Sequence, residues 1–305
     1  MSRSRRIPVL PLVAALTLIP VGAARSEPPD VPVPKAAPSC DREDFRVVLD
    51  VGHTAESPGA MSARGVGEYE FNLRLAKRID EDLIKAGFSK TKLMVTNGPG
   101  KRSLYARVAR ANRLSPDLLL SIHHDSVPEQ FKQEWFFDGK LEASSYLYKG
   151  HSIFVSDLNA QRKDSLAFAS MLGEQLAARG LKYTPHYTER FMGRNRHTLL
   201  DAKAGVYRYD ALFVLKKPRM PAVLLEAGSI VNREEELELD KPARQEKIGA
   251  AVVDAVDSFC LAQTRPGPQI LQSARSARHI RHRRAPQKNP VVAPIATRRP
   301  AGSTY

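Results

Sequence analysis

A short, nearly continuous apolar run, Phe45-Arg-Val-Val-Leu-Asp-Val51, ends directly in Gly52-His53. Such a run is typical of a strand that is buried on both faces, as strands of parallel sheets are. Similar runs occur further along the chain. They are Lys92–Thr96, Asp117–Ile122, Ser152–Val155, Ala211–Leu215 and Pro221–Leu225. The sequence therefore predicts a sheet of roughly six strands.

Helical patterns separate these runs. They cover Glu68–Ala86, Ser103–Leu114, Lys163–Arg179 and Pro242–Phe259. Gly87 and Gly180 follow two of them as stop signals. Strands that alternate with helices predict an α/β fold, here a three-layer α/β/α arrangement with a mostly parallel sheet. Ligands of such sheets bind outside the carboxyl ends of the strands.

The two ends of the chain differ in composition from its middle. Residues 1–26 and 264–305 are basic and contain no Asp or Glu, which leaves a net charge of +1 for residues 27–263 out of a total of +14. Basic Met1–Arg6 and the proline-broken apolar stretch Ile7–Ala24 are typical of a secretory signal peptide rather than of a membrane span. We therefore expect an exported protein, in the periplasm, with no transmembrane anchor after signal cleavage.

This composition predicts four segments. They are a signal peptide (1–26), a Pro-rich linker (27–43), a catalytic domain (44–262) and a basic, Pro-rich, disordered tail (263–305). A near-neutral folded domain argues against nucleic acid as a partner, because phosphate binding needs a basic patch on the domain itself. The tail either adheres to anionic envelope polymers or is simply solvated.

Two cysteines, Cys40 and Cys260, lie at the two edges of the predicted domain. In an oxidising compartment a disulfide between them would join the ends of the domain and contribute at most about 4–5 kcal/mol. Two unpaired thiols are the alternative, and spacing does not distinguish the two.

Residues capable of metal binding or acid–base chemistry stand at the ends of three predicted strands. His53 follows the first strand, His123 follows Leu118–Ile122, and Glu226 follows Ala222–Leu225. Carboxyl ends of parallel strands meet at one edge of a sheet, so we expect these side chains to converge. His123 and His124 are neighbours on a strand, and only one of them can face a given site.

The helix that begins near Gly67 offers two carboxylates. Glu68 shares a helical stripe with Asn72 and apolar residues, whereas Glu70 lies on the opposite side, with Arg74 four residues on. Glu68 is therefore the inward carboxylate, and burying it is costly unless a cation or hydrogen bonds satisfy it. His53, Glu68 and His123 together fit one catalytic zinc ion, and Glu226 is then free to act as the base that takes a proton from zinc-activated water.

These residues resemble the zinc-dependent N-acetylmuramoyl-L-alanine amidases of the type 3 family. The resemblance spans Arg46 to Phe259. It rests on Leu49–His53 with Pro58–Ala60, Gly67-Glu68 with Asn72-Leu73, Arg107 with Ala111-Asn112, Ser121–His123, and Pro221–Gly228 with Asn232. It implies His53, Glu68 and His123 as zinc ligands and Glu226 as the catalytic acid–base. The implied function is hydrolysis of the amide between the lactyl group of N-acetylmuramic acid and L-alanine in peptidoglycan, in cell-wall remodelling or daughter-cell separation.

The sequence also departs from the family pattern, at Thr54-Ala55, Ser57, His124, Ser229 and Val231. These changes leave the four site residues intact but affect the expected shape of the substrate groove. His124 either binds substrate or only packs against neighbouring residues. Some relatives carry a helical plug after the strand equivalent to Ser152–Val155. Only Ser156–Arg162 follows that strand here, so we expect an enzyme that needs no activator protein, although Asp125–Gly150 with Trp135 is a candidate lid.

Three arginines, Arg64, Arg107 and Arg194, are candidates to meet carboxylates of the stem peptide. Two other functions stay open on the sequence alone. One is another zinc hydrolase of the cell wall, such as a carboxypeptidase, because the same ligands and base serve many amide bonds. The other is a non-catalytic wall-binding protein, which the presence of all three ligands together with Glu226 argues against.

Overall fold

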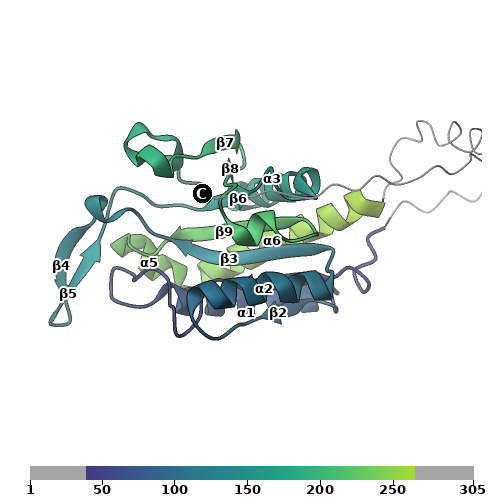
Figure 1. The fold of residues 1–305 in the computed structure, drawn as a ribbon, viewed down its shortest axis with the longest axis horizontal. Coiled ribbons are helices and arrows are strands. Elements are labelled where there is room, and N and C mark those ends of the chain that lie inside the picture. The colour runs from purple at the N-terminus through teal and green to yellow at the C-terminus, as the bar shows by residue number, and fades with distance from the viewer. Residues whose placement is uncertain (1–38, 265–305) are drawn as a thin grey trace, which may run out of the picture. The chain divides into compact units, whose positions relative to one another are not determined.

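A seven-stranded sheet forms the centre of the computed structural model, which describes residues 39–264 (Figure 1). Its strands are β1 (Val47–Val51), β2 (Lys92–Met94), β3 (Leu118–Asp125), β6 (Ser152–Val155), β7 (Thr198–Asp201), β8 (Val206–Arg208) and β9 (Ala222–Ser229). They lie in the order β2-β1-β3-β9-β6-β8-β7. The strand pairs β2–β1, β1–β3, β3–β9 and β6–β8 are parallel. The pairs β9–β6 and β8–β7 are antiparallel.

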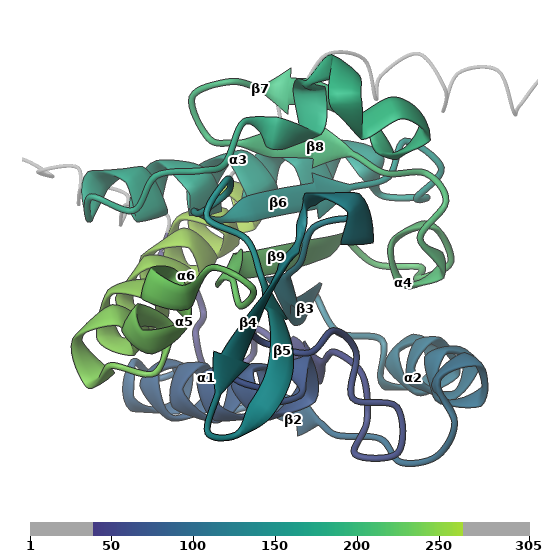
Figure 2. The ribbon, with the colours of Figure 1, turned by 90° about the vertical axis from the view of Figure 1, so that its left-hand side faces the viewer.

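Helices cover both faces of this sheet (Figure 2). They are α1 (Glu68–Lys85), α2 (Gly100–Leu114), α3 (Arg162–Ala178), α4 (Phe213–Lys216), α5 (Arg233–Leu239) and α6 (Pro242–Thr264). Alternate residues of β1 belong to the two hydrophobic cores on opposite faces of the sheet. Val47 and Leu49 pack in the core with α1, α3 and α6, whereas Val48 packs in the core with α2 and α4. The predicted three-layer α/β/α fold with a mostly parallel sheet is therefore confirmed.

The stripe predicted for α1 is buried from end to end. Glu68 and Asn72 are buried together with Leu75, Ala76, Ile79 and Leu83. Glu70 is exposed, as expected. Arg74, however, forms an ion pair (2.8 Å) with Asp240, which lies between α5 and α6, and not with Glu70. The 3.6-residue period thus brings a carboxylate to the first turn of a helix that otherwise buries apolar side chains.

One predicted strand is wrong. The run Ala211–Leu215 contributes to the short helix α4, which places Val214 and Leu215 against the sheet. A short apolar run is compatible with a strand or with a buried helical turn, and only the packing decides between them. The edge strand β7, its neighbour β8 and helix α5 were not predicted.

A separate two-stranded hairpin lies between β3 and β6, in the segment 125–150 that was the candidate lid. It consists of β4 (Gln133–Phe137) and β5 (Lys140–Ser144) and follows a 3₁₀ turn, Glu129–Phe131. Asp138 and Gly139 connect the strands with φ values of 49° and 74°. Positive φ at both central residues is typical of the type I′ turn that favours Asp-Gly.

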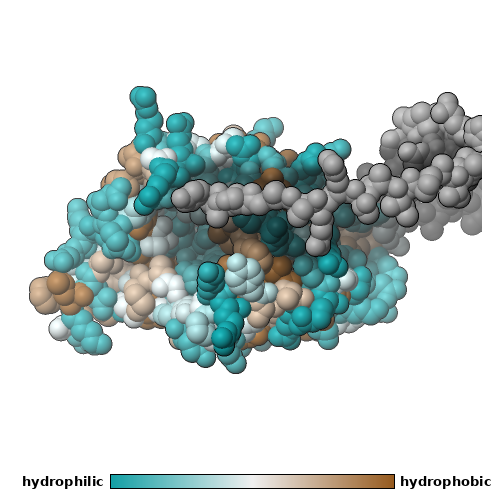
Figure 3. Space-filling view, viewed as in Figure 1, coloured by the Kyte–Doolittle hydropathy of each residue, from teal (hydrophilic) through white to brown (hydrophobic). Residues whose placement is uncertain are grey.

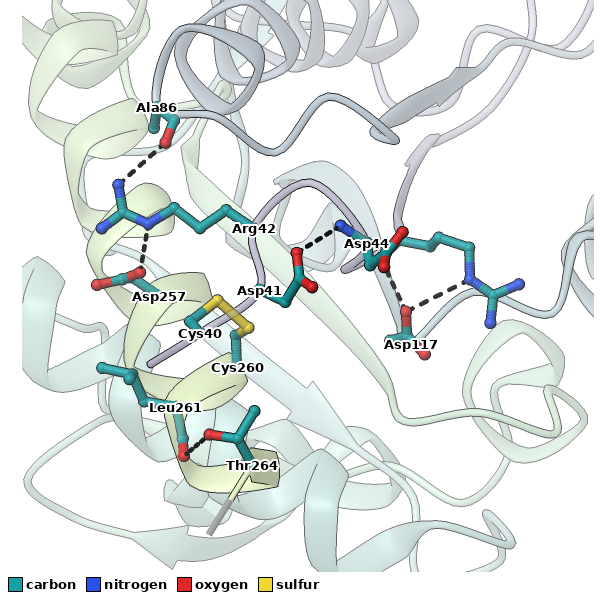
Figure 4. The surroundings of a disulfide bond; sticks show 11 residues. Cys40, Asp41, Arg42, Asp44, Ala86, Asp117, Asp257, Cys260, Leu261 and Thr264 are labelled. Carbon is teal, nitrogen blue, oxygen red and sulfur yellow. Dashed lines mark hydrogen bonds and ion pairs between the residues drawn. A yellow bond between two sulfur atoms is a disulfide. The ribbon is translucent and has the colours of Figure 1, made fainter. Parts of the chain in front are cut away.

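Cys40 and Cys260 form a disulfide that joins the turn before β1 to α6 (Figure 4). Beside it, Arg42 donates hydrogen bonds to Asp257 of α6 (2.8 Å) and to the carbonyl of Ala86 at the end of α1 (3.0 Å). The first residues of the described chain are thereby attached to two helices of the same layer.

The expected signal peptide, most of the linker and all but the first residues of the tail lie outside the described residues. Within residues 39–264, no helix combines the length and the apolarity that crossing a membrane requires.

Candidate metal centre and active site

His53, Glu68 and His123 come together although they lie on three different elements. His53 follows β1, Glu68 is the first residue of α1, and His123 lies inside β3. One potential ligand atom from each lies within 4.8 Å of the others, so the group could hold a metal ion. β3 extends through Asp125, so His123 stands within a strand and not after it, with a register shift between His123 and Asp125.

Glu68 is the centre of this group. Its Oε1 lies 2.9 Å from His123 Nδ1, and its Oε2 lies 3.0 Å from His53 Nε2. Burial acts to raise the pKa of the Glu68 carboxyl, but its contacts with His123 and His53 hold that pKa well below the usual value. Burial also lowers the pKa of His123. The group therefore favours a carboxylate beside a neutral imidazole, which are the forms that bind metal ions.

The backbone approaches this group closely on one side. His53 adopts φ = 65°, a left-handed conformation that is uncommon outside glycine. Gly59 has φ = 81°, and a Cβ atom on it would lie 2.5 Å from Glu68 Oε2 and 2.7 Å from the His53 ring. The next residue, Ala60, donates its N–H to Glu68 Oε2 (3.2 Å). Position 59 therefore has no room for a side chain while the three residues keep this arrangement.

Glu226 lies on β9 beside His123 of β3, its partner in the parallel register. It lines the same cavity of about 370 Å³ as His53, Glu68 and His123, and its Oε2 is buried without a hydrogen-bond partner among the described residues. Burial raises the pKa of Glu226 well above its usual value, and the negative charges of Asp125 and Glu68 act in the same direction. Such a carboxyl group can hold a proton near neutral pH.

Asp125 and Tyr187 form a second polar pair in this cavity, which the sequence did not reveal. The Tyr187 hydroxyl lies 2.8 Å from both carboxylate oxygens of Asp125 and donates to them. Burial raises the pKa of Asp125 to about 7, although the Tyr187 hydrogen bond opposes this shift. Tyr187 belongs to the 3₁₀ turn His186–Thr188, far from β3 in sequence, so no local pattern indicated the contact.

His124 does not belong to the group of His53, Glu68 and His123, but it lines the same cavity, and its backbone N–H donates to Glu68 Oε1 (3.3 Å). It lies against the ring of Phe71, and its Nδ1 is 2.8 Å from Asn72 Oδ1. Asn72 in turn donates to Glu68 Oε1 (3.2 Å) and to the carbonyl of Gly52 (3.2 Å). Burial lowers the pKa of His124 to about 3, so the imidazole is neutral. His124 therefore packs and supports Asn72, which orients Glu68.

The three candidate arginines differ in position. Arg107 lines the cavity, donates to the carbonyl of Val51 (2.9 Å) and lies 3.4 Å from Asp50. Arg64 is bound to Glu236, and Arg194 is exposed on a 3₁₀ segment outside the cavity lining. Only Arg107 therefore lies where a ligand beside the three-residue group would meet it.

The donor set fits a metal ion better than it fits a closed protein network. Within residues 39–264, His123 Nε2 is buried without a hydrogen-bond partner, and the Glu68 carboxylate contacts two imidazoles. Two imidazoles and one carboxylate with an open side are typical of catalytic zinc sites. The open side is a cavity whose other walls are largely apolar and aromatic, including Leu104, Phe154 and Phe213.

Known proteins are similar to this chain in sequence and in fold. Residues 47–258 match the family model described as N-acetylmuramoyl-L-alanine amidase. The chain is 28% identical over 225 residues to the N-acetylmuramoyl-L-alanine amidase AmiA of Escherichia coli strain K12, covering 70% of this chain and 75% of that protein. It is 26% identical over 224 residues to the uncharacterized protein YqiI of Bacillus subtilis strain 168, covering 71% and 85%.

Solved structures of amidases have a similar fold. The amidase Ami1 of Mycobacterium smegmatis superposes with a TM-score of 0.54 at 20% identity, over 72% of this chain and 98% of that one, and supports the fold. The catalytic domain of CwlV from Bacillus (Paenibacillus) polymyxa var. colistinus superposes with a TM-score of 0.50 at 25% identity, over 70% and 97%. The family model and the match to AmiA support amidase activity on peptidoglycan. Because the family model covers most of the folded chain, this protein belongs to the N-acetylmuramoyl-L-alanine amidase family.

Proposed function

We propose that this protein is a zinc-dependent hydrolase that cleaves the amide between the lactyl group of N-acetylmuramic acid and L-alanine in peptidoglycan. The main support is that half-buried Glu226 lines the same cavity as His53, Glu68 and His123. The family match supports the choice of bond.

One zinc ion per chain would be held by His53, Glu68 and His123. When bound, it supplies Lewis acidity toward the amide carbonyl and makes hydroxide available from water near neutral pH. Asn72 and the N–H of Ala60 keep the Glu68 carboxylate in position through hydrogen bonds of 3.2 Å each. Outer contacts of this kind fix the orientation of metal ligands.

Glu226 acts as general base and then as general acid in this proposal. Its unpartnered Oε2 accepts the proton from the attacking water and delivers it to the departing alanine nitrogen. An amide nitrogen is a poor leaving group unless it is protonated, so this delivery is needed for the C–N bond to break. The apolar walls of the cavity limit the access of other water molecules.

In the cell, we propose that the protein is exported to the periplasm and acts in cell-wall remodelling or daughter-cell separation. The basic tail would hold it on anionic envelope polymers. Only Ser156–Gln161 lies between β6 and α3, which supports an enzyme that is active without an activator protein. Turnover of isolated sacculi by the purified protein alone is the expected result, and strict dependence on a second protein would contradict it.

Metal removal tests the proposed chemistry. Treating the purified full chain with a chelator should abolish release of stem peptides from sacculi, because the proposed hydrolysis depends on the Lewis acidity of the metal ion. Adding one equivalent of Zn²⁺ should restore the activity, and elemental analysis should find about one zinc per active chain. Unchanged turnover after complete metal removal would contradict the zinc mechanism while leaving the family assignment intact.

A further inference from the structure

Ser152, the first residue of β6, is the direct neighbour of Glu226 in the sheet. β6 and β9 are antiparallel, and their register pairs these two residues. Directly opposed residues of an antiparallel pair project from the same face of the sheet, with Cβ atoms about 4.5–5.5 Å apart. The Ser152 hydroxyl group therefore stands beside the Glu226 carboxyl group.

This shared face is the one that carries the cavity. Phe154 and Leu224, two residues along from the pair, are also direct partners in the register. Both belong to the hydrophobic core with α2 and α4, and both line the cavity together with Glu226. Figure 3 shows the molecule from the side of α2, with apolar surface near the middle of the view. Because strand residues alternate between the two faces, Ser152 projects to this same side.

The two side chains of the pair each have a polar atom without a partner. Ser152 is 0% exposed, and within residues 39–264 its Oγ forms no hydrogen bond. Glu226 Oε2 likewise has no partner in that range. A buried hydroxyl group without a hydrogen bond destabilises the folded state relative to alanine. The serine is therefore costly at this position unless its hydroxyl group is used in another state of the site.

The other neighbouring strand offers no polar side chain at this level. β6 pairs there with β8, and Ile153 is the partner of Val206. The residue before Val206, level with Ser152, is Gly205, which has no side chain. Within the described sheet, Glu226 is thus the polar side chain that directly flanks Ser152.

We propose that Ser152 is a positioning residue for Glu226. Rotation about its Cα–Cβ bond lets the hydroxyl group donate a hydrogen bond to the Glu226 carboxylate, which holds that carboxylate toward the water it deprotonates. A carboxylate accepts about four hydrogen bonds, so it can still take the proton. Ser152 does not line the cavity and acts through Glu226 alone. The inference rests on the proposed function, because it requires Glu226 to be the general base.

Ser152→Ala tests this role on the metal-loaded full chain with a soluble N-acetylmuramyl peptide as substrate. The variant should lower kcat about tenfold, the effect of one hydrogen bond to a charged group. KM should stay at the wild-type value, because the hydroxyl group does not contact substrate. The free energy of unfolding should be unchanged or higher, since the variant removes a buried hydroxyl group that lacks a partner. Wild-type kcat in this variant would overturn the role of Ser152.

A double-mutant cycle separates this role from a purely structural one. In a Glu226→Ala background the carboxylate is absent, so adding Ser152→Ala should change the residual kcat by less than about twofold. The slow turnover can be followed at high enzyme concentration. A tenfold loss in both backgrounds would show that the hydroxyl group acts independently of Glu226, and would overturn the proposal.

Ser165→Ala is the matched control. Ser165 of α3 is also 0% exposed, and its Oγ accepts a hydrogen bond from the N–H of Ala222 in β9 (3.0 Å), four residues before Glu226. This variant should keep the wild-type kcat, and an equal loss in it would overturn the specific role of Ser152. Absence of turnover by the wild type would overturn the proposed function, and the role of Ser152 with it.

Discussion

Glu226 is the residue on which the proposed chemistry depends most. Glu226→Gln keeps the size of the side chain but removes the proton acceptor, so kcat on muramyl peptides should fall about 10²–10⁴-fold. Zinc content should stay at the wild-type level, because Glu226 is not among the three grouped ligands. Steady-state kinetics together with elemental analysis check both expectations. Wild-type kcat in this variant would remove Glu226 from the mechanism.

Some candidate site residues can be predicted from the sequence and others cannot, for a physical reason. His53, His123 and Glu226 stand where predicted strands end. The carboxyl ends of parallel strands lie at one edge of a sheet, so local sequence patterns are enough to predict that these side chains come together. Glu68 follows from helical periodicity. Asp125 and Tyr187 meet only through tertiary structure, because Tyr187 sits on an irregular segment that no periodicity locates. The supporting role of Asn72 likewise depends on where His124 points.

At the scale of single elements, long periodic helices are the most predictable parts. α1, α3 and α6 begin and end within a few residues of the predicted limits, because each buries a continuous apolar stripe. β7 and β8 could not be predicted because they are short, with four and three residues, and carry no clear pattern of apolar residues. The hairpin did carry a signal, Asp138-Gly139 between two extended runs, which is typical of a type I′ turn.

The disulfide between Cys40 and Cys260 links the start of the folded chain to its last helix. The bond closes a loop with a sequence separation of 220 residues, so it restricts the unfolded chain strongly. Cys40→Ala/Cys260→Ala should lower the free energy of unfolding by about 3–5 kcal/mol, as measured by urea denaturation. Reducing the wild type should give the same loss. An unchanged unfolding midpoint in both experiments would contradict a stabilising role.

His151, immediately before β6, predicts how stability depends on pH. It is buried, and burial lowers its pKa to about 4, with the charge of Arg244 acting in the same direction. The unfolded chain protonates this histidine below its ordinary pKa of 6.5 while the folded chain does not, so stability is lost as pH falls from about 6.5 toward 4.

The loss due to His151 should be about 2 kcal/mol between pH 7 and pH 5. His151→Leu cannot be protonated, so the difference in unfolding free energy between these two pH values should shrink by that amount. Urea denaturation of both proteins at each pH measures it. An equal difference in the variant and the wild type would show that His151 is not kept neutral by burial.

At the scale of the whole molecule, the excess of basic residues and the candidate site lie in different parts of the chain. The basic residues that give the net charge of +14 are concentrated in the two ends, whereas residues 27–263 hold the sheet and the candidate site with a net charge of +1. Composition alone therefore predicts a near-neutral catalytic body.

The bond that this protein cleaves is the central claim, and mass analysis of its products from purified sacculi tests it most directly. The account predicts intact stem peptides with a free L-alanine amino terminus, together with glycan chains that have lost their peptides. Glycopeptides that keep L-alanine on the lactyl group and have lost only a carboxyl-terminal residue would contradict it.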